Sequence, residues 1–397
     1  MSQGFKNQGN TATIDITVKR KPKDLDHVLE DFEIDLDTWI VDNYVVNTWE
    51  VGMKGPDGSP VVVPLYQVKV WLRRKVAVLT ELPVLHPIEV KVEKKKRKSY
   101  KPKMWEKALI IPDSQNGYMR DVFSGELKPF HDRLAWDAAI HLAEDIQPDR
   151  IVLLGDMLDL PTWTDKYTRK PEFYWTTQPA LIELGWYLGR LREVCPAHTR
   201  IDWMEGNHEF RLRNMIMHHM TEAFQLRAID QIDGTSALSI PNLMCLDSLG
   251  VDYHDDYPNS DIWLGQKIRI IHGHAHGKAA LHNMVKDELN YLIVGHLHRV
   301  EMIHKTLWPR DGHPQPIGVV AGGCLVDLKG DLPRVVPKND WQNAVLEIDY
   351  PTSKECKAAP VITPILINKG LAYRNKKMYQ GHFSKKELIK ATGWKYF

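Results

Sequence analysis

The sequence predicts an α/β protein in which short buried strands alternate with amphipathic helices. Two stretches, 131–146 and 179–194, carry apolar residues at helical spacing. Around them lie short apolar runs that are typical of buried strands: 108–112, 151–154, 201–205, 268–272 and 292–294. Because a strand, helix, strand order favours parallel pairing, we expect a layered α/β structure with helices on the faces of a sheet.

The composition is that of an ordinary globular protein. Of 397 residues, 43% are hydrophobic and 26% are charged, which excludes a mostly disordered or fibrous chain. No apolar run approaches the ~18 residues of a membrane helix, and the N-terminus lacks an apolar signal core. We therefore expect a cytoplasmic protein without a membrane partner. The four cysteines are far apart, which favours reduced thiols over a cysteine zinc site.

The N-terminal part of the chain predicts a small module that contains β-strands. Residues 1–23 are polar and are expected to form a flexible tail. Residues 24–90 follow as the module, which opens with a short helix and continues with strands over 44–54 and 61–75. A Gly-Pro-Asp-Gly turn joins the strands, and Pro64 favours an edge position because proline cannot donate a main-chain hydrogen bond.

A dense basic run separates this module from the rest of the chain. Residues 91–107 contain nine Lys or Arg and two Glu, a local net charge of +7 in a chain whose total is +1. Because like charges this dense repel one another and stay unpacked, the run is interpreted as a linker. Residues 108–350 then form the main domain, and residues 351–397 form a C-terminal extension to which the sequence assigns no structure.

Each expected strand of the main domain is followed at once by side chains that bind metals. The strand ends read Asp-Ser-Gln at 113–115, Gly-Asp-Met-Leu-Asp at 155–159, Gly-Asn-His-Glu at 206–209, His-Gly-His at 272–274 and Gly-His-Leu-His at 295–298. Any one of these residues alone is more often a turn, cap or core residue. In open α/β sheets, however, ligands bind beyond the carboxyl ends of the strands. Five such ends together therefore indicate a polynuclear metal site.

This ordered set of motifs resembles that of the calcineurin-like metallophosphoesterase superfamily, over about residues 108–330. It is closest to the branch that includes DNA double-strand-break repair nucleases and putative phosphoesterases of phages and prophages. The second motif ends in Asp159-Leu160-Pro161 rather than in the Asp-Arg-Gly of eukaryotic-type protein phosphatases. The resemblance implies a four-layer αββα sandwich, in which helices flank two mixed sheets, with two divalent metal ions at the rim.

The resemblance also implies a set of ligands in which Asp156 bridges the two ions. The first ion would be held by Asp113, Gln115, Asp156 and His298, and the second by Asp156, Asn207, His272 and His296. His208 would not bind metal, and would face the leaving group of the substrate as an acid or electrostatic partner. Glu209 would orient His208 or its loop.

Two ligand positions stay open. The family usually has His where this chain has Gln115. An amide oxygen is a harder and weaker donor, which favours Mn²⁺, with Mg²⁺, Fe or Zn²⁺ as alternatives. The other possibility is that Gln115 does not ligate and the first ion is lost. Within the His-Gly-His run we prefer His272, because it ends the strand directly, which leaves His274 as an outer residue.

Two divalent ions fit the hydrolysis of a phosphoester. They neutralise the phosphoryl oxygens and lower the pKa of a bridging water, so that hydroxide exists near neutral pH. Arg211 is suited to a phosphate contact, although a solvated helix face is an equally good interpretation.

Three functions follow in order of preference. The first is a phosphodiesterase or nuclease that hydrolyses nucleic acid, especially DNA, by a metal-bridging hydroxide; if phage-encoded, it would act in the host cytoplasm. The basic run at 91–107 suits such a partner by counterion release, although it also fits a solubilising linker. The second is a phosphatase or pyrophosphatase for a nucleotide or other small molecule. The third is a nucleic-acid-binding protein with a structural metal site.

Overall fold

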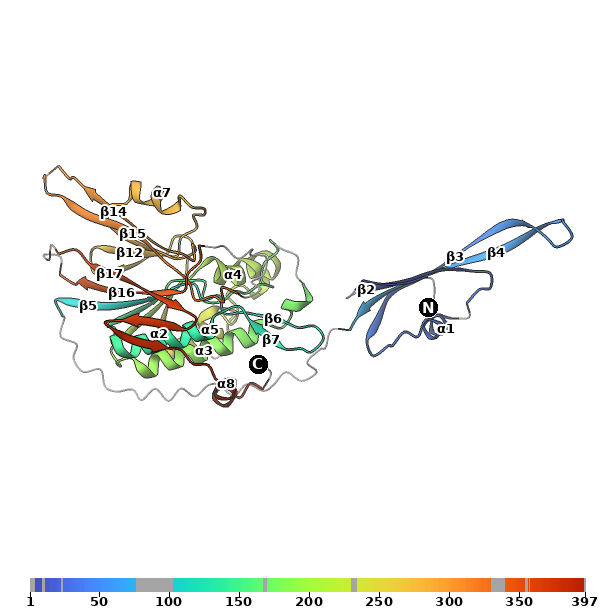
Figure 1. Ribbon diagram of the computed structural model, residues 1–397, viewed down its shortest axis with the longest axis horizontal. Helices are drawn as coiled ribbons and strands as arrows, with labels where there is room; N and C mark the ends of the chain where they lie inside the picture. The colour runs from blue at the N-terminus through green and yellow to red at the C-terminus, as the bar shows by residue number, and fades with distance from the viewer. Residues whose placement is uncertain are drawn as a thin grey trace. The chain divides into compact units, whose positions relative to one another are not determined.

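The computed structural model describes residues 4–8, 11–22, 24–75, 103–166, 170–229, 234–310, 312–329, 340–353, 356 and 358–395. They belong to two compact units, Met1–Glu81 and Leu82–Phe397, each with its own hydrophobic core (Figure 1). In the described parts no helix is long and apolar enough to cross a membrane.

The N-terminal unit is a four-stranded antiparallel sheet with a helix on one face. The sheet has the order β1-β2-β4-β3 and consists of β1 (Phe5–Asn7), β2 (Thr11–Val18), β3 (Trp39–Lys54) and β4 (Pro60–Arg74). Helix α1 (Leu25–Asp31) begins after Asp24, whose side chain accepts a hydrogen bond from the first turn. The helix buries Val28 and Leu29 against the sheet.

Two expectations for this unit change. The flexible tail expected at residues 1–23 is wrong for β1 and β2, because Ala12 and Ile14 are buried in the core of the unit. Their polar neighbours point to the other face and conceal the strand in the sequence. Pro64 lies on an edge of the sheet, as expected, but β4 is not an edge strand along its whole length. Its Tyr66–Arg73 part lies between β2 and β3, whereas its Pro60–Leu65 part pairs with β3 alone.

The C-terminal unit is a four-layer αββα sandwich, so the predicted fold class is confirmed. Its larger sheet has the order β10-β9-β8-β5-β16-β17-β18-β19, and its smaller sheet the order β11-β12-β13-β15-β14. Helices α2 (Arg133–Ile146) and α3 (Thr177–Val194) cover the outer face of the larger sheet. Helix α7 (Ala280–Asp287) covers the outer face of the smaller one (Figure 1).

The strands that precede the five motifs run parallel to one another within each sheet. They are β5 (Trp105–Ile111), β8 (Arg150–Leu153) and β9 (Arg200–Met204) in the larger sheet, and β12 (Ile268–Ile271) and β13 (Tyr291–Val294) in the smaller one. The other strands of the two sheets are β10 (Val251–His254), β11 (Ile262–Leu264), β14 (Val300–Leu307), β15 (Gln315–Gly322), β16 (Ala344–Pro351), β17 (Val361–Asn368), β18 (Leu371–Arg374) and β19 (Lys377–Gln380).

Shorter elements complete this unit. They are β6 (Tyr118–Arg120), β7 (Leu127–Pro129), η1 (Pro171–Phe173), α4 (Asn207–His219), η2 (Thr221–Ala223), α5 (Ile240–Leu243), α6 (Leu246–Leu249) and α8 (Lys385–Thr392).

Alternation along the strands divides the core into layers. In β5, Ala108 and Ile110 face the smaller sheet and join the apolar core between the two sheets. Leu109 and Ile111 point the opposite way and pack in the core that contains Trp136 of α2. Because both faces of β5 are covered, its sequence is apolar without interruption from Ala108 onward.

The domain boundaries drawn from the sequence shift at both ends of the main domain. Most of the expected linker, residues 91–102, lies outside the described residues. Lys107 belongs to β5, and its Nζ lies 2.8 Å from a carboxylate oxygen of Asp349, so it is paired rather than unpacked. The expected C-terminal extension at residues 351–397 is part of the domain, because β17–β19 continue the larger sheet and Leu388 of α8 joins the helical core.

Candidate metal centre

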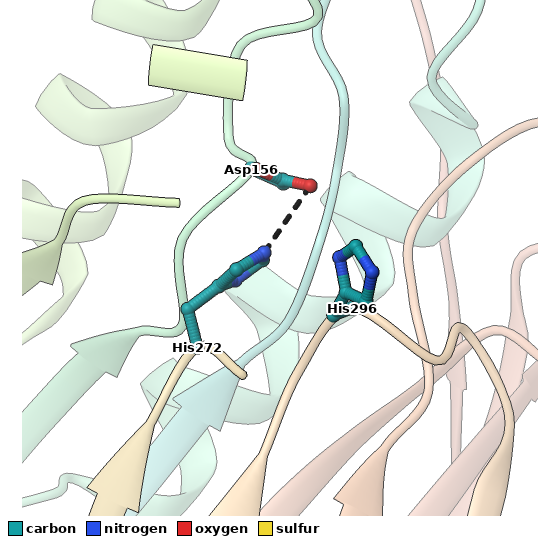
Figure 2. A group of neighbouring side chains, drawn as sticks. All are labelled: Asp156, His272 and His296. Atoms are coloured by element: carbon teal, nitrogen blue, oxygen red, sulfur yellow. Dashed lines mark ion pairs between the residues drawn. The ribbon is translucent and has the colours of Figure 1, made fainter. Parts of the chain in front are cut away.

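The side chains after the parallel strands meet at one rim of the C-terminal unit. Asp156 follows β8, whereas His272 and His296 follow β12 and β13 of the other sheet. One ligand atom from each of these three residues lies within 4.8 Å of the others. Figure 2 shows the two imidazoles beside the Asp156 carboxylate, with a dashed line for the ion pair to His272. The rim thus joins donors from both sheets.

Asp156 has the most contacts in this cluster. Its Oδ2 lies 3.3 Å from His272 Nε2 and 3.7 Å from His208 Nε2. Its Oδ1 accepts a hydrogen bond of 2.8 Å from the main-chain N–H of His208. Burial alone would raise the pKa of Asp156, but His208 and His272 hold it well below its ordinary value. The side chain is therefore an ionised, buried carboxylate that can ligate a cation.

His272 is oriented as metal-binding histidines usually are. Its Nδ1 donates to the main-chain oxygen of Leu154 at 2.8 Å, which turns Nε2 toward the cluster. There Nε2 lies 3.1 Å from Oδ1 of Asn207, the first residue of α4. Burial lowers the pKa of His272, but Asp156 outweighs this and raises it to about 10. A cation bound here would displace the Nε2 proton.

Asp113, Gln115 and His298 form the other half of the centre. Asp113 Oδ2 accepts from the His296 main-chain N–H at 2.7 Å and lies 3.2 Å from His298 Nε2. The amide Nε2 of Gln115 lies 3.4 Å from His298 Nε2. Rotating this amide by half a turn would present its oxygen at the same place. The Gln115 main chain also donates to the Asp156 carbonyl oxygen at 2.8 Å, which joins the two halves.

These residues fit a pair of divalent cations. They offer carboxylate, amide and imidazole atoms, which suit ions of intermediate hardness such as Mn²⁺. Asp113 Oδ1 is buried and has no hydrogen-bond partner among the described residues. A buried carboxylate oxygen without a donor is costly unless an ion completes its shell. The structure brings together all seven expected ligands, and the assignment of Gln115 as a ligand stays a prediction.

The main chain of the site is held in an uncommon conformation. Gln115, Asp156, His296 and His298 all adopt positive φ, at 45°, 50°, 63° and 57°. Residues other than glycine rarely do so unless the surrounding structure requires it. These left-handed residues follow β5, β8 and β13.

Glu209 holds the turn that carries Asp156. Its carboxylate accepts hydrogen bonds of 2.9 Å from the main-chain N–H groups of Asp156, Leu158 and Gly206. Burial, with the nearby charge of Asp156, raises the pKa of Glu209 to about 8. The residue thus acts on the two loops and does not contact the His208 ring among its described hydrogen bonds.

Two contacts of the centre were missed by sequence reasoning. Asp159 Oδ1 lies 2.9 Å from Nδ1 of His208, although the motif that contains Asp159 was identified. Nδ1 of His276 lies 3.0 Å from Nε2 of His296. His274, the expected outer residue, is exposed and its role stays a prediction; His276, which is also exposed, is the residue of this loop that contacts His296. The alternating histidines at 272, 274 and 276 were the available signal.

Fold and site together define an αββα sandwich with a buried cluster of metal-binding side chains at the sheet rim. No family model matches the chain. The gene 54 proteins of Mycobacterium phages L5 and D29 are 29% and 26% identical over 220 residues, covering 52% of this chain and 79% of each phage protein.

Among solved structures, a 5'-nucleotidase precursor from Thermus thermophilus has 12% identity and a TM-score of 0.27. That match covers 66% of this chain and 54% of the precursor, so the chain spans about half its length. The purple acid phosphatase PPD1 from yellow lupin seeds has 10% identity and a TM-score of 0.31. This match covers 96% of this chain and 73% of the phosphatase chain. Likenesses this low carry no argument about the site.

Proposed function

We propose that this chain is a phosphoester hydrolase that depends on two divalent metal ions, most of all a phosphodiesterase that acts on DNA. The proposal is supported by the seven side chains expected as ligands, which follow five strand ends; three of them, Asp156, His272 and His296, form a group that could hold a metal ion. One buried Asp113 oxygen is left without a donor among the described residues. When bound, such ions neutralise phosphoryl oxygens and lower the pKa of a water that attacks phosphorus.

The proposed residues have different roles in binding the ions and the substrate. Asp113, Gln115 and His298 would hold one ion, Asn207, His272 and His296 the other, and Asp156 both. His208 is not assigned to this set: its Nδ1 lies 2.9 Å from Asp159 Oδ1, and its Nε2 lies 3.7 and 3.5 Å from Asp156 and Gln115. That placement suits a proton donor or electrostatic partner for the departing oxygen.

The choice of DNA as substrate is supported by charge. Of the nine Lys or Arg between residues 91 and 107, Lys103 and Lys107 pair with Asp149 and Asp349. The other seven would release counterions on binding a polyanion. Because the relatives are phage proteins, the proposed site of action is the host cytoplasm.

The test is hydrolysis of single- and double-stranded DNA, bis-p-nitrophenyl phosphate and p-nitrophenyl phosphate by the Mn²⁺-loaded chain. We expect DNA cleavage and diester turnover, both abolished by a chelator. Turnover of a small phosphoester without DNA cleavage would reject the DNA part and favour a small-molecule phosphatase. DNA binding without any turnover would instead indicate a structural metal site.

A further inference from the structure

Arg211 donates to the nitrogen of His208 that faces the metal centre. The two residues lie one turn apart on α4, so their side chains share a face of the helix. Arg211 Nη2 lies 2.8 Å from His208 Nε2, and Arg211 Nη1 donates to the main-chain oxygen of Asp159 at 2.6 Å. Because a guanidinium can only donate, His208 Nε2 must present its lone pair to Arg211.

This contact conflicts with the role proposed for His208. A nitrogen that accepts from Arg211 has no proton to give to a leaving oxygen. Its other nitrogen, Nδ1, lies 2.9 Å from Asp159 Oδ1 and is not available to substrate. Arg211 and a leaving oxygen are therefore alternative partners for the same atom.

The charge of Arg211 is also only weakly neutralised. Its closest described carboxylate oxygen is Asp159 Oδ1, at 3.8 Å, and that oxygen already faces His208. Arg213, two residues further along α4, differs because its Nη2 lies 2.5 Å from Glu205 Oε2. Arg211 thus keeps the capacity to bind an anion, and Arg213 does not.

We propose that Arg211 is a substrate-binding residue that rests on His208 until a phosphoryl group arrives, and then donates to a phosphoryl oxygen instead. A guanidinium bonds an oxyanion more strongly than a neutral imidazole, so substrate supplies the driving force. The inference rests on the proposed phosphoesterase function, and it makes the release of His208 depend on a correctly placed phosphate.

The chemical step then balances. A water oxygen bonds to phosphorus while the bond from phosphorus to the leaving oxygen breaks. Once Arg211 has left it, Nε2 of His208 takes a proton from solvent and passes this proton to the leaving oxygen, while the proton lost by the water passes to solvent. Arg211 holds the phosphoryl oxygen and exchanges no proton.

The test compares Arg211→Lys with Arg213→Lys, two matched changes that keep the charge and lose the planar fork. Binding of inorganic phosphate to the Mn²⁺-loaded full chain is measured by calorimetry, and KM and kcat are measured with bis-p-nitrophenyl phosphate. For Arg211→Lys we expect phosphate affinity to fall and KM to rise by about tenfold, because the charge-assisted hydrogen bond from the guanidinium to a phosphoryl oxygen is lost. Arg213→Lys should match the parent chain.

Unchanged phosphate affinity and KM in Arg211→Lys would overturn the inference, as would a fall in kcat alone, which would mean that Arg211 acts only through His208. Metal content and thermal unfolding show whether the Arg211→Lys variant is folded and loaded. If the variant is not intact, Arg211→Gln is measured in its place. If the parent chain turns over no phosphoester, the proposed function fails, while the phosphate titration still decides the role of Arg211.

Discussion

At the scale of single residues, Asp156 and His208 are neighbours with different partners. Asp156 is surrounded by the histidines of the proposed ligand set, whereas His208 is held through Asp159 and Arg211. The His208 ring also lies 3.7 Å from Asp156 and 3.5 Å from Gln115, but its shorter contacts are with Asp159 and Arg211, so removing the ring should leave the ligand set in place. The roles of the two residues are therefore separable by experiment.

Replacing Asp156 or His296 by Ala should abolish both metal content and activity, because each removes a ligand. Replacing His208 by Ala should lower turnover with the metals retained. Elemental analysis of the purified variants, beside their DNA hydrolysis rates, measures both quantities. Equal metal loss in all three variants would show that the role assigned to His208 is wrong.

Glu209→Gln should loosen the Asp156 turn. The amide offers one acceptor oxygen and a donor N–H₂ group, so at least one of the three main-chain N–H groups loses its partner. We expect the free energy of unfolding to fall by about 1–3 kcal/mol and metal affinity to fall with it. Chemical denaturation and metal titration measure these effects; a variant as stable as the parent would contradict the role.

At the scale of elements, the strand-end turns need glycine where the two sheets approach each other. Gly155 has φ +86°, and a Cβ there would lie 2.6 Å from Nδ1 of His272 and 2.9 Å from Cα of Gly206. Gly312 has a similar φ of +76°, but a Cβ there would meet nothing within 4 Å. Replacing Gly312 by Ala would introduce backbone strain alone, whereas replacing Gly155 by Ala would add steric contacts to the same strain.

Gly155→Ala should therefore abolish metal binding at the centre. Gly312→Ala should only lower the free energy of unfolding by the strain of positive φ, about 1–2 kcal/mol. The measurement is metal content after refolding, together with the denaturation midpoint. Retention of the metals in Gly155→Ala would mean that the turn can move away from His272 without losing its ligands.

The sequence predicted those elements whose pattern is local. The apolar runs before the five motifs are the five parallel strands, and their order determined which donors meet at the rim. Strands β17–β19 were missed because half of their residues are exposed, so their place in the fold follows only from pairing in the larger sheet. His276 was missed because its contact with His296 depends on how the loop after β12 folds back.

At the scale of the whole molecule, a buried ionic group connects helices α2 and α3 and strand β6 of the C-terminal unit. Glu183 of α3 accepts from Nε and Nη2 of Arg133 on α2, at 2.9 and 2.8 Å, and lies 2.9 Å from Nε2 of His131. Tyr118 of β6 donates to the same carboxylate. Burial alone would raise the pKa of Glu183, but His131 and Arg133 together hold it well below its ordinary value of 4.5.

Because the pKa is lowered by folding, Glu183 stabilises the fold fully above about pH 4.5, and this contribution is lost as the pH falls below that value. The free energy of unfolding, measured from pH 7 to pH 3, should therefore decrease at the acid end. Glu183→Gln should be less stable at neutral pH and should show a shallower acid decrease. Parallel curves for the two proteins would contradict this account.

The basic run should govern affinity for DNA rather than chemistry. Exchanging residues 94–98 for Ser removes five positive charges. The slope of log affinity against log salt should then shrink by up to about 4, with turnover of bis-p-nitrophenyl phosphate unchanged. An unaltered slope would identify the run as a linker without a role in DNA binding.

The prolines of β4 have a consequence for what the N-terminal unit can join. Pro60 and Pro64 lie in the half of β4 that pairs with β3 alone, so their nitrogens, which carry no hydrogen, belong on its open side. A further strand therefore cannot pair with that side of β4 through an unbroken series of main-chain hydrogen bonds. In the part of the chain that the structure describes, the 16 residues of β3 pair only with β4, so the other edge of β3 is the one that can accept an incoming strand.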